Sequence, residues 1–156
     1  MTFRAAMYKG TRPGLPGIYN RLVRWWTRSP YSHCELVFST GHAASASFMD
    51  KGVKIRVIDF DPNRWDFIAL PKALEKSAFE WFEAHRNQPY DVLGNVQFIV
   101  ARVADDKRKW FCSESIAAAL GLTDPWRYDP GTLASVLAVL KESVKKDGLP
   151  DLLADR

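Results

Sequence analysis

One cysteine near the start of an expected helix is the sharpest chemical feature of this sequence. Cys112 follows Trp110 and Phe111 and leads into a helical stretch over 113–120. Free backbone N–H groups and the positive end of the helix dipole lie at such a position, and both favour thiolate over thiol. The thiolate is the reactive form, and the same N–H groups can hold an oxyanion. The position indicates a nucleophile, although a small buried core cysteine gives the same pattern.

His33 is the best candidate for the base that such a cysteine needs. The segment over 32–38 alternates like a strand, with an apolar face that includes Cys34 and a second face that carries His33 and Glu35. A histidine on that second face can take a proton from a cysteine across the junction of sheet and helix. A partly exposed strand histidine without a catalytic role is the alternative.

A catalytic imidazole usually has an orienting partner for its second nitrogen. Glu35 is on the same strand face as His33, but about 6–7 Å along the strand. Ser47 lies opposite His33 on the next expected strand if a tight turn joins the two. A shift of one residue in that register removes Ser47 from the site. Glu35 and Ser47 both remain candidates for this role.

Periodicity and turn formers predict the elements that have to position these side chains. Strands cluster between flanking helices, which indicates an α+β fold with an antiparallel sheet. The length of 156 residues fits a single domain over 1–156, with a core over about 31–121. The expected helices cover 18–28, 71–85, 93–103, 113–120 and 132–146, and the expected strands cover 32–38, 43–48, 53–60 and 66–70.

The expected helix over 18–28 is amphipathic. Such a helix, with arginines beside an apolar stripe, can lie on an anionic membrane surface. A tryptophan can bury a large apolar area, so we expect Trp25 and Trp26 to pack in the core and treat peripheral membrane contact as the alternative. The apolar stripe consists of Ile18, Leu22, Trp25 and Trp26, and the other face carries Arg21, Arg24 and Arg28.

Composition limits the classes of function. Two cysteines exclude a disulfide framework, and the histidines and cysteines lack the spacing of a zinc site, so we expect no metal or organic cofactor. The net charge of +4 suits anionic partners such as cell-wall polymers or acidic lipids, and we expect no nucleic acid. No signal-peptide core or long apolar stretch is visible, which predicts a soluble cytoplasmic protein. The oligomeric state is left open.

The order of the motifs resembles a known family. Ser32–Val37 is similar to the histidine strand of the circularly permuted NlpC-type papain-fold hydrolases, and Trp110–Glu114 is similar to their cysteine motif, an aromatic residue followed by Cys-Ser-Glu. Tyr90–Gly94 resembles the Tyr-Asp segment often found before that motif. In papain-like enzymes of the usual order the cysteine comes first, whereas here the histidine does. The resemblance spans about 31–120.

This resemblance implies a papain-like fold in which a helix packs on an antiparallel sheet, with Cys112 as the nucleophile and His33 as the base. It implies amide or ester cleavage through a thioester, without a cofactor. The third polar residue of the family usually sits on the strand after the histidine strand. There this chain has Ser45 and Ser47 in place of the usual Glu, His, Asn or Gln.

Members of the family include cell-wall peptide amidases, thiol peptidases and lipid acyltransferases, and small stand-alone members include some encoded by tailed phages. We therefore expect a thiol hydrolase of bacterial or phage origin that acts on a peptide, peptidoglycan-like or acyl substrate. A lipid-directed thiol acyltransferase or lipase is the first alternative. A catalytically weak binding module with the same fold is the second.

Overall fold

The structure contains a five-stranded antiparallel sheet. The computed structural model describes residues 1–47, 49–89 and 110–146, with side chains described as far as Lys141. The strands are β1 (Arg4–Tyr8), β2 (His33–Val37), β3 (His42–Ser47), β4 (Gly52–Val57) and β5 (Trp65–Ala69). Their order across the sheet is β4-β3-β2-β1-β5, and every neighbouring pair is antiparallel.

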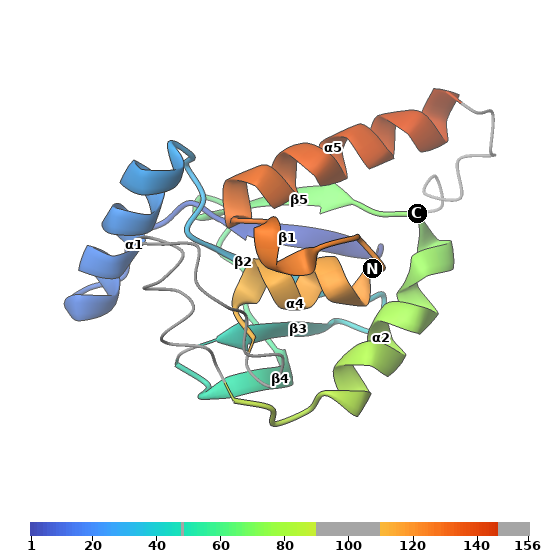
Figure 1. Ribbon diagram of the computed structural model, residues 1–156, viewed down its shortest axis with the longest axis horizontal. Helices are drawn as coiled ribbons and strands as arrows, with labels where there is room; N and C mark the ends of the chain where they lie inside the picture. Colours follow the sequence, from blue (N-terminus) through green and yellow to red (C-terminus); the bar gives the residue numbers. More distant parts are fainter. Residues whose placement is uncertain (48, 90–109, 147–156) are drawn as a thin grey trace.

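The described part of the chain also contains four α-helices. They are α1 (Leu15–Thr27), α2 (Glu75–Ala84), α4 (Cys112–Ala119) and α5 (Pro130–Lys146), with 3₁₀ turns at Lys72–Leu74 and Pro125–Arg127. Helix α4 packs on β2 and β3, α5 runs along β5, and α2 contacts α4 and β4. Figure 1 shows α1 and α2 at opposite ends of the molecule. The expected α+β class is confirmed.

Most expected elements are present, with boundaries that differ by a few residues. Helix α1 begins three residues early because Pro16 fits the first helical turn, where its missing N–H is not needed. The strand expected over 53–60 ends at Val57, and the helix expected over 71–85 begins with a 3₁₀ turn before α2. The helix expected over 93–103 lies outside the described residues.

Strand β1 is the element that periodicity missed, although it is central to the sheet. It pairs with β2 on one side and with β5 on the other. Ala5, Ala6, Met7 and Tyr8 are all buried, so both faces of the strand are covered and no apolar-polar alternation marks it. The two alanines also have low strand propensity. Burial on both faces, rather than local preference, therefore places this segment in the sheet.

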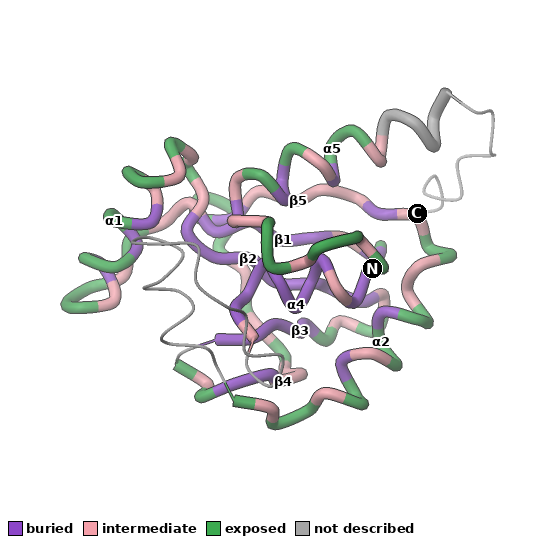
Figure 2. The backbone as a smooth tube through the Cα atoms, viewed as in Figure 1, coloured by how far each residue is buried: buried purple, intermediate pink, exposed green. Residues whose placement is uncertain are grey.

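The two faces of the sheet carry apolar clusters of different size, and Figure 2 shows the buried residues along the strands and α4. The main core lies between the sheet and helices α2, α4 and α5. Its largest members include Phe3, Met7, Leu36, Phe38, Phe82, Ile116, Leu133 and Leu137. The smaller cluster on the opposite face consists of Ala6, Tyr8, Val37, Ala43 and Trp65, with Ile58, Phe60 and Phe67 against it.

The expectation that the tryptophans of α1 pack in the core was wrong. Trp25 is 74% exposed and Trp26 is 49% exposed. The opposite side of the helix faces the protein because its polar groups have partners there. Arg24 donates hydrogen bonds to the backbone carbonyl of Lys9 at 2.6 Å, and the Asn20 amide donates one to Ser32 Oγ at 3.0 Å. These contacts orient α1 with its apolar stripe outward.

The described residues on either side of 90–109 are joined to each other. The Trp110 N–H donates to the Pro89 carbonyl at 3.2 Å, and the Trp110 indole N–H donates to Gln88 Oε1 at 2.6 Å. The Val53 N–H donates to the Gln88 carbonyl at 2.9 Å. A Cβ at Gly52 would lie 2.1 Å from that carbonyl oxygen, so the close approach requires glycine. The chain that leads into α4 is thereby attached to β4.

Candidate active site

The local structure at the start of α4 fixes the position of Cys112. Cys112 is the first residue of the helix, after Phe111 in an extended conformation. Glu114 accepts a hydrogen bond from the Phe111 N–H at 3.3 Å, and Ser115 Oγ donates one to the Cys112 carbonyl at 2.8 Å. Glu114 therefore serves the helix N-terminus, as glutamate in the first turn commonly does. The expected placement of Cys112 at the first turn is confirmed.

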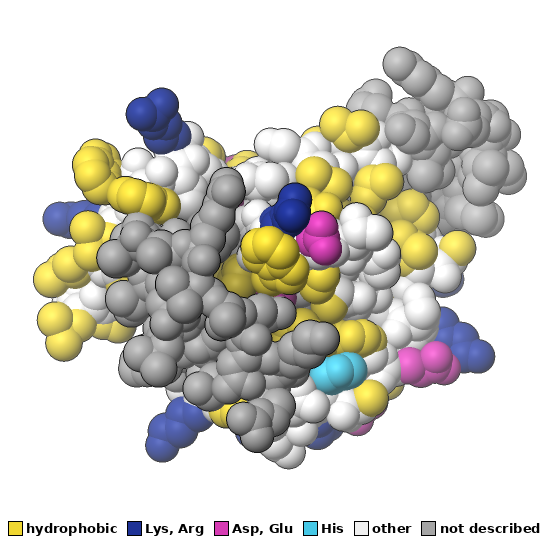
Figure 3. Space-filling view, viewed as in Figure 1, with side chains coloured by type: hydrophobic (Ala, Val, Ile, Leu, Met, Phe, Trp, Pro, Cys, Tyr) yellow, Lys and Arg dark blue, Asp and Glu magenta, His cyan; other side chains and the backbone are white. Residues whose placement is uncertain are grey.

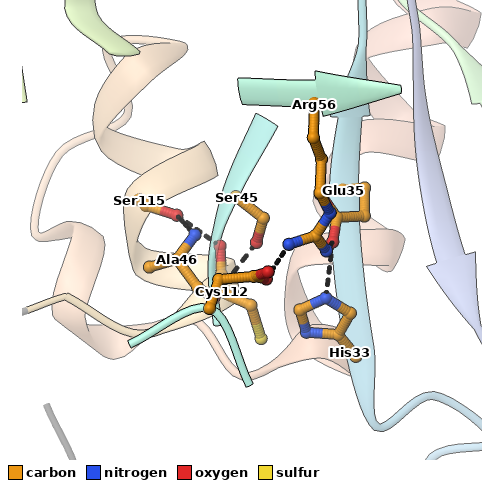
Figure 4. Close-up of polar contacts among 8 residues, drawn as sticks. His33, Glu35, Ser45, Ala46, Arg56, Cys112 and Ser115 are labelled. Atoms are coloured by element: carbon orange, nitrogen blue, oxygen red, sulfur yellow. Dashed lines mark hydrogen bonds and ion pairs between the residues drawn. The ribbon is translucent and has the colours of Figure 1, made fainter. Parts of the chain in front are cut away.

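A separation between β2 and β3 lets Cys112 reach the histidine strand. Within these two described strands, the ladder pairs Leu36 with Ala44 and Val37 with Ala43, near the connecting turn, and does not continue toward His33. The Ala46 N–H instead donates to Ser115 Oγ at 3.2 Å. Figure 4 shows Cys112 between the two separated strands. The start of α4 thus lies at the opening, within reach of both sheet faces.

His33 and Cys112 face each other at this opening. In Figure 4 the Cys112 sulfur lies beside the imidazole ring, on the side away from Glu35. Burial alone lowers the pKa of His33, but the charge of Cys112 and hydrogen bonds to Cys112 and Glu35 raise it to about 9. A hydrogen bond from Cys34 and attraction to His33 hold the pKa of Cys112 well below its ordinary value, although burial opposes this. Both shifts favour a thiolate next to an imidazolium.

Glu35 is hydrogen-bonded to the other nitrogen of the His33 imidazole. Its Oε1 atom lies 2.8 Å from His33 Nε2, and its side chain is buried. Arg56 on β4 donates to the same Oε1 atom at 2.7 Å, and its guanidinium also pairs with Asp50. A buried carboxylate needs such partners, because an unpaired charge away from water is costly. Arg56 and Asp50 were not anticipated from the sequence, since their approach depends on the β3–β4 register.

The two serines considered for the orienting role have other partners. Ser45 Oγ donates to the Ala46 carbonyl at 3.2 Å. Ser47 is buried and pairs with Gly52 in the β3–β4 ladder. Because the β2–β3 ladder stops short of His33, the cross-strand pairing on which the choice of Ser47 rested is not formed. The structure brings His33, Cys112 and Glu35 together.

Cys34 belongs to the site, which sequence reasoning missed. It is buried, as expected, and hydrogen bonding from its thiol and its backbone N–H contributes to the lowered pKa of Cys112. Burial and the hydrogen bond to Cys112 raise the pKa of Cys34 well above its ordinary value, so it stays a protonated donor. One sequence feature could have revealed this role of Cys34. It follows His33 directly and therefore lies on the opposite face of the strand, which is the face that α4 covers.

Aromatic side chains pack next to the imidazole. The edge of Trp65 meets the ring of His33 with 6.2 Å between ring centroids, and Tyr8 packs on Trp65 at 4.9 Å. This apolar contact limits the positions that the imidazole can take. In the described ranges, no group of three or more His, Cys, Asp and Glu side chains could hold a metal ion.

No protein-family model matches the chain, and no curated protein sequence matches it either. Across the described residues, no helix combines the length and the apolar character needed to cross a membrane.

Proposed function

We propose that the protein is a thiol hydrolase in which Cys112 is the nucleophile and His33 is the general base and acid. The observation that carries this proposal is the alignment of Cys112, His33 and Glu35, with one imidazole nitrogen toward sulfur and the other 2.8 Å from the carboxylate. A nucleophile, a base and an orienting group in this order is the arrangement that activates a weak nucleophile. The lowered pKa of Cys112 supports it.

The chemistry follows from the charges of the pair. The Cys112 thiolate attacks the carbonyl carbon of an amide or ester, and the carbonyl electrons move to oxygen. N–H groups of the first turn of α4 stabilise that oxyanion. The His33 imidazolium donates its proton to the leaving amine or alcohol as the bond to carbon breaks, which leaves a thioester on Cys112. Neutral His33 then removes a proton from water, which attacks the thioester and releases a carboxylic acid and the thiolate.

The proposed fold is the permuted papain-like fold of NlpC-type hydrolases. Its supports are the helix that begins at Cys112, the antiparallel sheet on which that helix packs, and the position of the histidine strand before that helix in the chain. Glu35, on the histidine strand itself, supplies the third polar group in this proposal. We propose a peptide or amide substrate, with bacterial cell-wall peptide as the first class to test, and a bacterial or phage origin.

A binding module without catalysis is the competing function. Its support was the lack of a usual third residue on β3, where Ser45 and Ser47 stand. Glu35 removes that support, because its buried carboxylate is aligned with His33. A module that only binds has no use for a buried thiolate and imidazolium, whose burial is costly.

The decisive experiment measures the rate of Cys112 alkylation by iodoacetamide against pH, with mass spectrometry to separate Cys112 from Cys34. We expect Cys112 to react far below the ordinary thiol pKa of about 8.5, and His33→Ala to move its profile to higher pH. Wild type and Cys112→Ala are then compared on a panel of peptidoglycan peptides and amides. The proposal would be refuted if Cys112 were alkylated with the pH profile of an ordinary thiol and His33→Ala left that profile unchanged. Substrate turnover retained by Cys112→Ala would also refute it.

A further inference from the structure

We infer that α1 is a docking helix for an anionic lipid surface. Its exposed apolar side chains recur every three or four residues, so they form one continuous stripe along the helix. The stripe consists of Leu15, Ile18, Tyr19, Leu22, Trp25 and Trp26, all of them exposed. A contiguous apolar face of this length on a protein surface marks an interaction site rather than ordinary surface variation.

The charges beside the stripe define the partner. Helix α1 contains no acidic residue. Its exposed Arg21, and the exposed Arg28 just after its last residue, flank the apolar side chains. The left edge of Figure 3 shows hydrophobic side chains gathered over α1, with Lys or Arg side chains at their margin. Tryptophan, leucine and isoleucine on one face with arginine beside them is the composition of helices that lie in the headgroup region of anionic membranes.

The orientation of α1 is fixed by the rest of the protein. Asn20 and Arg24 point inward to Ser32 and to the carbonyl of Lys9. The apolar side is therefore held outward without rearrangement. Trp25 and Trp26 lie side by side near the end of the helix, with 6.3 Å between ring centroids. Two indole rings with apolar bodies and N–H groups suit the boundary between acyl chains and water.

A second copy of the chain fits this surface less well. A two-fold interface brings this patch against the same patch of the other copy, so the arginines of both copies would gather at one interface. No acidic residue of α1 compensates them. Like charges placed together at an interface oppose association, whereas anionic headgroups attract the same arginines.

Docking through α1 would bring the Cys112 site to the membrane surface. The helix connects directly to β2, and the Asn20 amide is bonded to Ser32, the residue before His33. If the proposed hydrolase activity holds, the substrate class becomes acyl esters or amides of lipids or of molecules held at that surface. That extension rests on the proposed function, whereas docking itself does not.

Vesicle co-sedimentation tests the docking. Wild type is mixed with vesicles of phosphatidylcholine alone and of phosphatidylcholine with phosphatidylglycerol, at low and high salt. We expect binding to the mixed vesicles that weakens in salt. The double variant Trp25→Ser/Trp26→Ser should lower the apparent affinity by about tenfold or more. Arg21→Glu should weaken binding to the vesicles that contain phosphatidylglycerol, and should leave binding to phosphatidylcholine vesicles unchanged.

Two controls make the outcomes separable. Trp126→Ser removes an exposed tryptophan outside α1 and should bind like wild type. Cys112→Ala should also bind like wild type, which separates docking from catalysis. Absence of binding to mixed vesicles, an equal loss in Trp126→Ser, or binding unaffected by Arg21→Glu would overturn the inference. So would a dimer in sedimentation velocity that dissociates in Trp25→Ser/Trp26→Ser without any vesicle binding, because it would assign the face to a second copy.

Discussion

His33 Nε2 and Glu35 Oε1 lie 2.8 Å apart, although the two residues belong to one strand with a single residue between them. Both side chains project from the same face of β2, and the ring and the carboxyl group bridge the spacing along the strand. The orienting group of the candidate site is therefore built into the histidine strand itself. Its position does not depend on how β2 pairs with β3.

Replacement of Glu35 by glutamine should reduce activity while the protein stays folded. The amide keeps the shape but loses the charge that stabilises the imidazolium and fixes its orientation. We expect kcat/KM on any substrate that wild type cleaves to fall by on the order of 100-fold. Ser47→Ala is the matched control and should change kcat/KM by less than about threefold. The opposite ranking of these two variants would assign the orienting role to Ser47.

Removal of the Arg56 guanidinium should destabilise the protein as well as the site. Arg56→Gln leaves the buried Glu35 carboxylate with fewer partners, since the guanidinium donates to its Oε1 atom at 2.7 Å. Because Arg56 is partly exposed, we expect a loss of roughly 1–3 kcal/mol in the free energy of unfolding, measured in urea. In the double variant Arg56→Gln/Glu35→Gln the two losses should be less than additive. Full additivity would argue against their coupling.

The pH dependence should reflect the two shifted groups. His33 has a folded pKa raised to about 9 from 6.5, so the stability it contributes is present below 6.5 and is lost as pH rises through about 9. Cys112 has a lowered pKa, so its contribution is present above the ordinary thiol pKa and is lost as pH falls through the folded value. We expect kcat/KM to decline above about pH 9, where His33 loses the proton for the leaving group.

Direct titration of His33 separates these contributions. In Cys112→Ala the thiolate that raises the pKa of His33 is absent, while the burial that lowers it remains. We expect the imidazole signals in NMR spectra to titrate at a lower pH in this variant than in wild type. An unchanged titration would show that His33 and Cys112 do not interact.

The Cys34 thiol should control the reactivity of its neighbour. Cys34→Ala removes the hydrogen bond that contributes most to the lowered pKa of Cys112. We expect Cys112 alkylation to need a higher pH in this variant, with at most about 1–2 kcal/mol lost in unfolding free energy from the smaller side chain. Cys34→Ser, which keeps a donor, should restore much of the low-pH reactivity. Identical profiles in all three proteins would leave Cys34 as a packing residue.

Sequence patterns located the residues of the candidate site better than the strands and side chains that surround them. A cysteine at a helix start and a histidine on an alternating strand are local features, so the elements around Cys112 and His33 could be predicted. Strand β1 could not, because it is buried on both faces and carries no alternation. The choice between Glu35 and Ser47 depended on where the β2–β3 ladder ends. The approach of Arg56 to Glu35 depended on how β4 pairs with β3. Both are set by tertiary packing.

The orientation of α1 also could not be predicted from local sequence. Its apolar stripe was plain in the sequence, but periodicity cannot tell whether such a stripe faces a core or a partner. The contacts of Asn20 and Arg24 decide this, and they involve Lys9, which follows β1, and Ser32 in the loop before β2. Local patterns therefore predicted the amphipathic helix, and long-range hydrogen bonds determine which of its sides faces the protein.

The hydrogen bonds of Trp110 to Pro89 and Gln88 connect the start of α4 to a strand that carries no residue of the thiol–imidazole pair. Gln88 is in turn bonded to Val53 of β4, and Arg56 of the same strand donates to Glu35. One edge strand therefore supports both the nucleophile and the orienting carboxylate, so a local disturbance of β4 would be felt at both ends of the candidate site.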